Sequence, residues 1–254
     1  MRELLRKSLR RAGLELHRYG SSTVGLDMEV DLVRATGGLP PGVIFDVGAN
    51  AGQTARRFAK AFPEARVFSF EPVPGTYTQL KTAAAPFPQV KTFNLALGSK
   101  KETIEIPLRE SSTHNTLRQE DGAFVDTASP ETGETVSVQV ETVAEMCARE
   151  HLPHIDLLKT DTEGFDLEVA KGAEPLILAH KIPFIYSETG LQPGDDRWTS
   201  FTEMRDWLAK RGYRVYGQYE FCRYEKPETP HYMGLAFCNT LFVNPTALKQ
   251  RFQV

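Results

Sequence analysis

Residues 43–71 read VIFDVGANAGQTARRFAKAFPEARVFSFE. A first apolar run leads to Asp46 and is followed by a turn that contains two glycines, Gly48 and Gly52. A helical pattern comes next, and a second apolar run ends at Glu71. This stretch predicts a strand–turn–helix–strand unit with a carboxylate at the end of each strand, as found around nucleotide-bearing cofactors in α/β proteins.

Strand and helix patterns alternate along most of the remaining chain. Strands are predicted at 43–47, 66–70, 90–94, 154–160, 182–188, 213–217 and 239–243, and helices at 53–62, 75–84, 142–150, 165–179 and 200–211. Such alternation is typical of a parallel sheet with helices on both faces. A chain of 254 residues is long enough for one domain of this kind. The sequence therefore predicts a doubly wound, Rossmann-like α/β fold.

Two segments depart from this alternation. Residues 1–40 lie before a glycine- and proline-rich break and form an N-terminal leader, so that the main domain is expected at 41–254. Within that domain, residues 99–140 contain two stretches of alternating polar and apolar residues with a polar loop between them. This pattern predicts a β insertion of half-buried strands.

The leader carries a basic amphipathic pattern. Residues 2–18 hold six basic and two acidic residues, and leucines recur among them at helical spacing. Two interpretations stay open for such a helix. It lies on an anionic membrane surface as a peripheral contact, or it packs on its own domain or on the second subunit of a homodimer.

Composition narrows the class of protein. The net charge of −3 argues against a nucleic-acid partner. No apolar run approaches the roughly 20 residues of a membrane span. The three cysteines, Cys147, Cys222 and Cys238, have no CxxC spacing and suit the reduced thiols of a cytoplasmic protein. We therefore expect a cytoplasmic protein, with the inner membrane surface as the alternative location if the leader binds lipid.

The turn after the first strand suits one nucleotide cofactor better than another. Asn50 stands where the GxGxxG pattern of dinucleotide sites has its middle glycine, and Asp46 lies beside the turn. A carboxylate there would repel a pyrophosphate but suit a cationic ligand, such as a sulfonium that also carries an amino group. The pattern favours S-adenosylmethionine, with a nicotinamide dinucleotide and a purely structural turn as alternatives.

Several further motifs carry a family resemblance. The motifs DVGANAGQT, starting at Asp46, and FEP, starting at Phe70, are followed by FNLALG at 93–98, by IDLLKTDTEGFD at 155–166 and by EVAKGA at 168–173. In this order and spacing they resemble the FkbM family of class I, S-adenosylmethionine-dependent methyltransferases. The resemblance implies a seven-stranded, mostly parallel sheet with an antiparallel last strand. It also implies O-methylation of a hydroxyl on a sugar, or on a polyketide or other natural product.

The resemblance also implies positions for the cofactor. Asp46, Gly48, Asn50 and Gly52 would surround the methionine moiety, Glu71 would bind the ribose, and Asn94 with Ala96 would lie near the adenine. Phe165 stands where many relatives have a small residue, which changes the local shape of the pocket.

Acidic residues at two neighbouring strand ends are the candidates for catalysis. Asp161 ends one predicted strand, Glu163 follows it, and Glu188 ends the next strand. An alcohol is a poor nucleophile, so these carboxylates would act as a base and as acceptors for sugar hydroxyls. Alternatively, Asp161 and Glu188 would bind one Mg²⁺, which prefers oxygen ligands. A third reading is that the acids only cap the following helix.

Two loops supply further candidates. His114 lies among small hydroxyl residues in the insertion and is a candidate general base. Tyr224, His231 and Tyr232 lie in the loop before the last strand, where aromatic rings would line an acceptor pocket.

Taken together, the sequence predicts an S-adenosylmethionine-dependent O-methyltransferase. Its acceptor would be a small molecule or an oligosaccharide, specifically a hydroxyl of a saccharide or glycosylated metabolite. The alternatives are a natural-product hydroxyl as acceptor or an NAD-dependent oxidoreductase.

Overall fold

A seven-stranded sheet forms the centre of the protein. The computed structural model describes residues 24–109, 131–195, 197–223 and 235–254. The strand order is β3-β2-β1-β7-β8-β10-β9. In that order the bounds are Val90–Phe93, Arg66–Phe70, Val43–Val47, Leu157–Thr160, Phe184–Gly190, Leu235–Val243 and Arg214–Arg223. The predicted doubly wound α/β fold is confirmed.

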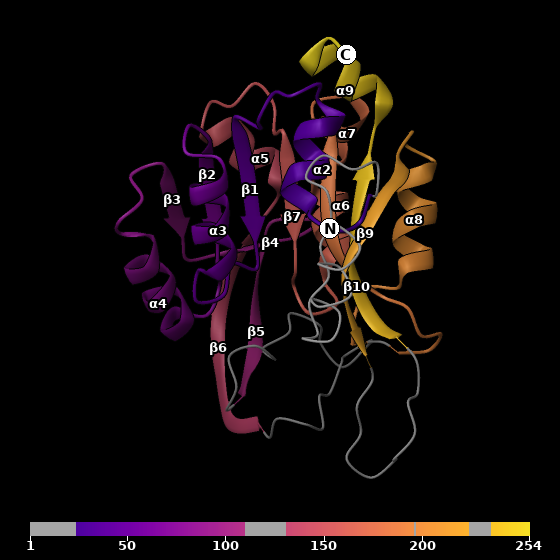
Figure 1. Ribbon diagram of the computed structural model, residues 1–254. Helices are drawn as coiled ribbons and strands as arrows, with labels where there is room; N and C mark the ends of the chain where they lie inside the picture. Colours follow the sequence, from indigo (N-terminus) through magenta and orange to yellow (C-terminus); the bar gives the residue numbers. More distant parts are fainter. Residues whose placement is uncertain (1–23, 110–130, 196, 224–234) are drawn as a thin grey trace, which may run out of the picture.

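The last strand runs against its neighbours, as the family resemblance implied. β1 pairs in parallel with β2 and β7, and β7 pairs in parallel with β8. β10 is antiparallel to both β8 and β9 and lies between them. The parallel strands point to one end of the molecule, where their carboxyl ends meet (Figure 1). Ligands of such sheets bind at that end.

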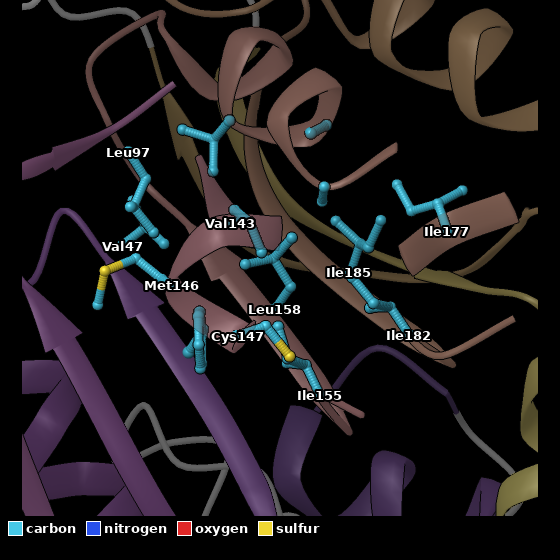
Figure 2. Packing of buried hydrophobic residues seen from close by; sticks show 14 of the residues in the cluster. Val47, Leu97, Val143, Met146, Cys147, Ile155, Leu158, Ile177, Ile182 and Ile185 are labelled. Carbon is cyan, nitrogen blue, oxygen red and sulfur yellow. The ribbon is translucent and has the colours of Figure 1, made fainter. Parts of the chain in front are cut away.

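Helices cover both faces of this sheet (Figure 1). Their bounds are Met28–Ala35 for α2, Gln53–Ala61 for α3, Pro74–Ala84 for α4, Val143–Arg149 for α5, Asp166–Gly172 for α6, Glu174–Leu178 for α7, Phe201–Ala209 for α8 and Pro245–Phe252 for α9. α2, α3 and α9 pack on one face, and α5 to α8 pack on the other. Figure 2 shows Val143 and Met146 of α5 near Val47 and Leu158 of the sheet.

One predicted helix is broken. The pattern at 165–179 predicts a single helix, but the structure has α6 and α7, which are separated at Ala173. Pro175 lies in the first turn of α7, where its missing N–H costs nothing, whereas inside a continuous helix it would clash with the preceding turn. β9 and β10 are also longer than the strands predicted at 213–217 and 239–243, and they pair with each other over this added length.

The expected β insertion forms a second sheet. β4 (Ala96–Leu97), β5 (Glu102–Arg109) and β6 (Glu131–Glu141) form a three-stranded sheet in the order β4-β6-β5. β5 and β6 are antiparallel, and they extend from the end of the molecule where the parallel strands finish (Figure 1). Phe165 packs against the cores of both sheets, so it joins the insertion to the main domain.

Only the end of the predicted leader lies within the described residues. Its α2 begins after Asp27, whose side chain accepts a hydrogen bond from the Val30 amide. Asp31 of α2 is buried and accepts a hydrogen bond from the Tyr219 hydroxyl at 3.0 Å, which ties the helix to β9. The basic segment at 2–18 lies outside the described residues. No helix in the described ranges is both long and apolar enough to span a membrane.

Candidate functional site

A cavity of about 200 Å³ lies at the carboxyl ends of the parallel strands. Its walls come from the turn after β1, the segments after β2 and β3, and the ends of β7 and β8. The lining residues are Val47, Gly48, Asn50, Phe70, Glu71, Pro72, Leu95, Ala96, Leu97, Asp161, Thr162, Glu163 and Glu188. Six of them (Gly48, Asn50, Glu71, Asp161, Glu163 and Glu188) are polar candidates or glycines predicted from the sequence.

The turn after β1 has the backbone conformation that its glycines allow. Gly48 has φ +72° and packs so tightly that an added Cβ would overlap the carbonyl oxygen of Asp161. Asn50 has φ +47°, which costs energy for a residue other than glycine. Strain of this kind collects at binding sites, and both residues line the cavity. Gly52 packs against Leu80 and Ala83 of α4 instead, so it shapes the turn from behind.

Glu71 holds the turn in place with backbone hydrogen bonds. One carboxylate oxygen accepts from the Asn50 amide at 3.1 Å, and the other accepts from the Val73 amide at 2.9 Å. Burial raises the pKa of Glu71 to about 7, although both of these hydrogen bonds lower it. A carboxylate oxygen can accept more than one hydrogen bond, so Glu71 retains capacity to accept from ligand hydroxyls.

Asn94 and Ala96, the residues expected near the adenine, have different surroundings. The Asn94 side-chain amide donates to the carbonyl oxygens of Glu71 and Pro72, at 2.9 and 2.8 Å. It therefore fixes the segment that follows β2 and is absent from the residues that line the cavity. Ala96 does line it, between Leu95 and Leu97. These two leucines supply an apolar wall that the sequence analysis did not assign.

Asp46 is buried beneath the cavity and is not one of its lining residues. Its carboxylate lies 3.1 Å from the ammonium group of Lys159, which is also buried. The same ammonium group donates to the Gly48 carbonyl oxygen at 3.0 Å and lies 3.5 Å from the Asp161 carboxylate. Burial alone would lower the pKa of Lys159, but Asp46 and Asp161 raise it above its ordinary value. A cation therefore already balances Asp46.

A group of carboxylates lines the cavity at and just after the ends of β7 and β8. Asp161, Glu163 and Glu188 line it, and Glu163 has φ +52°. Burial raises the pKa of Glu188 well above its ordinary value, and the nearby carboxylates raise it further because like charges disfavour ionisation. Asp166, which the sequence analysis left without a role, is buried beside them, and burial with the Asp161 charge raises its pKa to about 6.

Other predicted site residues cannot be placed. His114, Tyr224, His231 and Tyr232 lie outside the described residues. Asp161 and Glu188 do share the cavity, as the Mg²⁺ prediction requires. Among the described residues, however, no group of three or more His, Cys, Asp or Glu side chains has an arrangement that could hold a metal ion.

Comparison with known proteins points to one family. A family model described as "Methyltransferase FkbM domain" matches residues 46–215. The match begins at the buried aspartate of β1 and ends in β9, so it includes every residue that lines the cavity.

Three curated relatives carry methyltransferase names. The 2-O-methyltransferase NoeI of Sinorhizobium fredii is 26% identical and the match covers 59% of this chain and 63% of NoeI. Methyltransferase sdnD of Sordaria araneosa is 29% identical over 52% of this chain and 60% of sdnD. The hexuronic acid methyltransferase AglP of Haloferax volcanii is 27% identical over 60% of this chain and 59% of AglP. The matched part therefore spans about six-tenths of the length of these relatives.

Proposed function

This chain belongs to the FkbM methyltransferase family, and on that premise we propose that it transfers a methyl group from S-adenosylmethionine to a hydroxyl of a saccharide or glycosylated metabolite. One observation carries the proposal. The cavity at the strand ends is lined by Glu71, Asp161, Glu163 and Glu188, and no Lys, Arg or His is among the lining residues that the structure describes. Such a cavity suits a cationic ligand.

The same lining favours S-adenosylmethionine over a nicotinamide dinucleotide. A dinucleotide carries a negatively charged pyrophosphate, which the carboxylates of Asp161 and Glu163 in the lining would repel. S-adenosylmethionine, when bound, supplies a methyl group on a positively charged sulfur. Gly48 and Asn50 would hold it through the backbone of the strained turn, and Glu71 would accept hydrogen bonds from its ribose hydroxyls. The apolar segment around Ala96 would contact the adenine.

Glu188 is the best-suited base among the carboxylates on the acceptor side. The Asp161 carboxylate lies 3.5 Å from the Lys159 ammonium group, so it is already engaged in an ion pair. Glu188 is buried among like charges, so it gains by taking up a proton. It would accept the proton of the acceptor hydroxyl while the oxygen bonds to the methyl carbon in line and the carbon–sulfur bond breaks, which would release S-adenosylhomocysteine. Asp161 and Glu163 would orient the acceptor by accepting hydrogen bonds from its other hydroxyls.

The names of two relatives support O-methylation and a saccharide acceptor respectively. One is named for 2-O-methylation and another for hexuronic acid. A natural-product hydroxyl is the alternative within the same chemistry.

Three further points remain predictions from the sequence. They are contact of the basic leader with a membrane surface, formation of a homodimer, and a role for Mg²⁺. Treatment of an active preparation with EDTA tests the last, because a metal-dependent enzyme would lose turnover and regain it with added Mg²⁺.

Two measurements test the proposed function. Titration calorimetry with S-adenosylhomocysteine, the product of the cofactor, should give tight binding, and titration with NADH should give none. Incubation with a methyl-labelled donor and a panel of glycans should then label a saccharide. Binding of NADH alone would contradict the proposal, as would labelling of a non-hydroxyl group.

A further inference from the structure

The two faces of β10 differ at the end nearest the cavity. Leu235, Phe237 and Asn239 are partly exposed, whereas Ala236, Cys238 and Thr240 between them are buried. Successive residues of a strand point to opposite faces of the sheet. One face of this segment is therefore covered, and the other is open among the described residues. The open face lies on the side of the sheet on which α2 and α3 pack, because Leu241 of β10 packs with those helices and faces the same way as Asn239.

Glu188, although buried, projects to the same side of the sheet as this open face. β8 and β10 pair in an unbroken register, in which Asn239 is opposite Glu188 and Phe237 is opposite Gly190. Residues directly opposite in an antiparallel pair have their side chains on the same face, with Cβ atoms about 5 Å apart. Asn239 is thus the direct neighbour of the proposed base. Phe237 lies two residues further from it along the strand.

An aromatic stack borders this surface. The rings of Phe237 and Trp198 are stacked, with centroids 4.7 Å apart and planes at 29°. Trp198 reaches Phe237 across Gly190, where an added Cβ would lie only 3.1 Å from the Trp198 Cβ. The guanidinium carbon of Arg197 lies over the Trp198 ring, 4.5 Å from the ring centroid, and this contact helps to fix the stack. The stack therefore holds a partly exposed aromatic side chain two residues along β10 from the position opposite Glu188.

The polar part of the surface is equally well fixed. The Asn239 amide nitrogen donates to the Glu220 carboxylate at 2.8 Å. The Tyr186 hydroxyl donates to the same carboxylate at 3.0 Å, and Arg57 donates to it at 2.7 Å. Glu220 has φ +52° and lies where the pairing of β9 with β10 shifts register. Asn239 is therefore oriented, with its side-chain carbonyl oxygen as an acceptor.

We propose that Phe237 and Asn239 form the acceptor subsite and that the ring bound there is a pyranoside. This inference rests on the proposed function. A pyranose ring has an apolar C–H face and hydroxyl groups around its edge, which match the Phe237 ring and the Asn239 amide respectively. The ring would lie on the open face of β10 and present one hydroxyl towards Glu188.

The test compares glycoside binding among variants while cofactor binding is monitored. The probes are methyl β-D-galactopyranoside and methyl β-D-glucopyranoside, observed by saturation-transfer NMR with protein saturated with S-adenosylhomocysteine. Phe237→Ala should weaken binding of the better probe about three- to tenfold, from the loss of an aromatic contact. Asn239→Ala should weaken it by a similar factor, from the loss of a hydrogen bond.

Matched variants separate recognition from folding. Phe221→Ala removes the same side chain from an exposed position on β9 and should bind the glycosides like the wild type. Phe237→Leu keeps an apolar side chain and tests the position if Phe237→Ala does not fold. In every folded variant, the affinity for S-adenosylhomocysteine should remain that of the wild type.

The outcomes distinguish this inference from the proposed function. Wild-type protein that binds S-adenosylhomocysteine but neither glycoside would overturn the pyranoside subsite and leave the proposed function standing. Undiminished glycoside binding by both Phe237→Ala and Asn239→Ala would also overturn it, with Phe237→Leu in place of the alanine variant if that variant does not fold. A wild-type protein that binds no S-adenosylhomocysteine would instead refute the proposed function itself.

Discussion

The two sides of the cavity are built on different principles. On the turn side, formed by Gly48, Asn50 and Glu71, the carboxylate accepts two backbone N–H groups and the backbone is strained into one shape. On the acid side, formed by Asp161, Glu163 and Glu188, like charges face one another, and the pKa of Glu188 is raised. The turn side is suited to holding a ligand, and the acid side is suited to accepting a proton.

Lys159 lies under both sides and connects them. Its ammonium group contacts a carbonyl oxygen of the turn side and a carboxylate of the acid side, as well as the buried Asp46. One buried cation can therefore balance a buried acid without being among the residues that line the cavity. Acidic side chains without a Lys, Arg or His therefore line the described part of the cavity, which suits the proposed cationic cofactor.

Gly48→Ala should break the turn side most severely. The added Cβ would overlap the Asp161 carbonyl oxygen, and the φ of +72° disfavours any side chain. We expect binding of S-adenosylhomocysteine to fall below detection in calorimetry. Gly75→Ala is the control, because its Cβ would meet nothing within 4 Å, and it should bind like the wild type. Equal binding by both variants would show that the turn does not hold the cofactor.

Lys159→Met should damage both sides through stability. Removing one partner of a buried ion pair leaves an uncompensated charge, here that of Asp46, and typically costs about 3–5 kcal/mol. Chemical denaturation measures the free energy of unfolding. Lys91→Met breaks an exposed ion pair with Glu150 and should cost at most about 1 kcal/mol. Adding Asp46→Asn to Lys159→Met should restore part of the lost stability. If Lys159→Met were as stable as Lys91→Met, the buried pair would not have the importance we give it.

Glu188→Gln should affect the acid side alone. Loss of a general base typically lowers turnover by about 100-fold or more, whereas the affinity for S-adenosylhomocysteine should change little. In the wild type, turnover should rise with pH as Glu188 loses its proton, at a pH above the ordinary range of a carboxyl because its pKa is raised. The variant should lack that rise. Glu203→Gln, at an exposed position on α8, serves as the control. An unchanged pH profile in Glu188→Gln would assign the base elsewhere.

Glu71→Gln should have the smallest effect and a clear pH signature. The pKa of Glu71 is raised to about 7, so its charged form, the better acceptor for ribose hydroxyls, forms as the pH rises through that value. The affinity of the wild type for S-adenosylhomocysteine should therefore increase from pH 6 to pH 8. Glu71→Gln should bind about tenfold more weakly at the upper end and show a flat dependence. Glu64→Gln, at an exposed position, is the control. If the affinity of Glu71→Gln rose with pH as steeply as that of Glu64→Gln, Glu71 would be excluded as the cause of the pH dependence.

Local patterns were enough for the sheet and the turn side. The apolar run before Asp46, the paired glycines and the acid after β2 are close together in the sequence, and their spacing alone predicted the unit that contains Gly48 and Glu71. The family resemblance added the order of later motifs, and the family match confirms it. The helix predicted at 165–179 was wrong in one respect, because hydrophobic periodicity does not register the break at Ala173 before Pro175.

The sequence by itself thus determined the fold class, the family and which strand ends meet, because hydrophobic periodicity and glycine spacing are local properties. Only the tertiary structure decided which charges balance one another. Asp46 was expected beside a cationic cofactor, yet the structure places Lys159 against it and leaves it out of the cavity lining. Phe237 and Asn239 become neighbours of Glu188 only through the pairing of β10 with β8. The strength of an electrostatic contact depends on distance and burial, and both follow from how remote strands are brought together in the folded sheet.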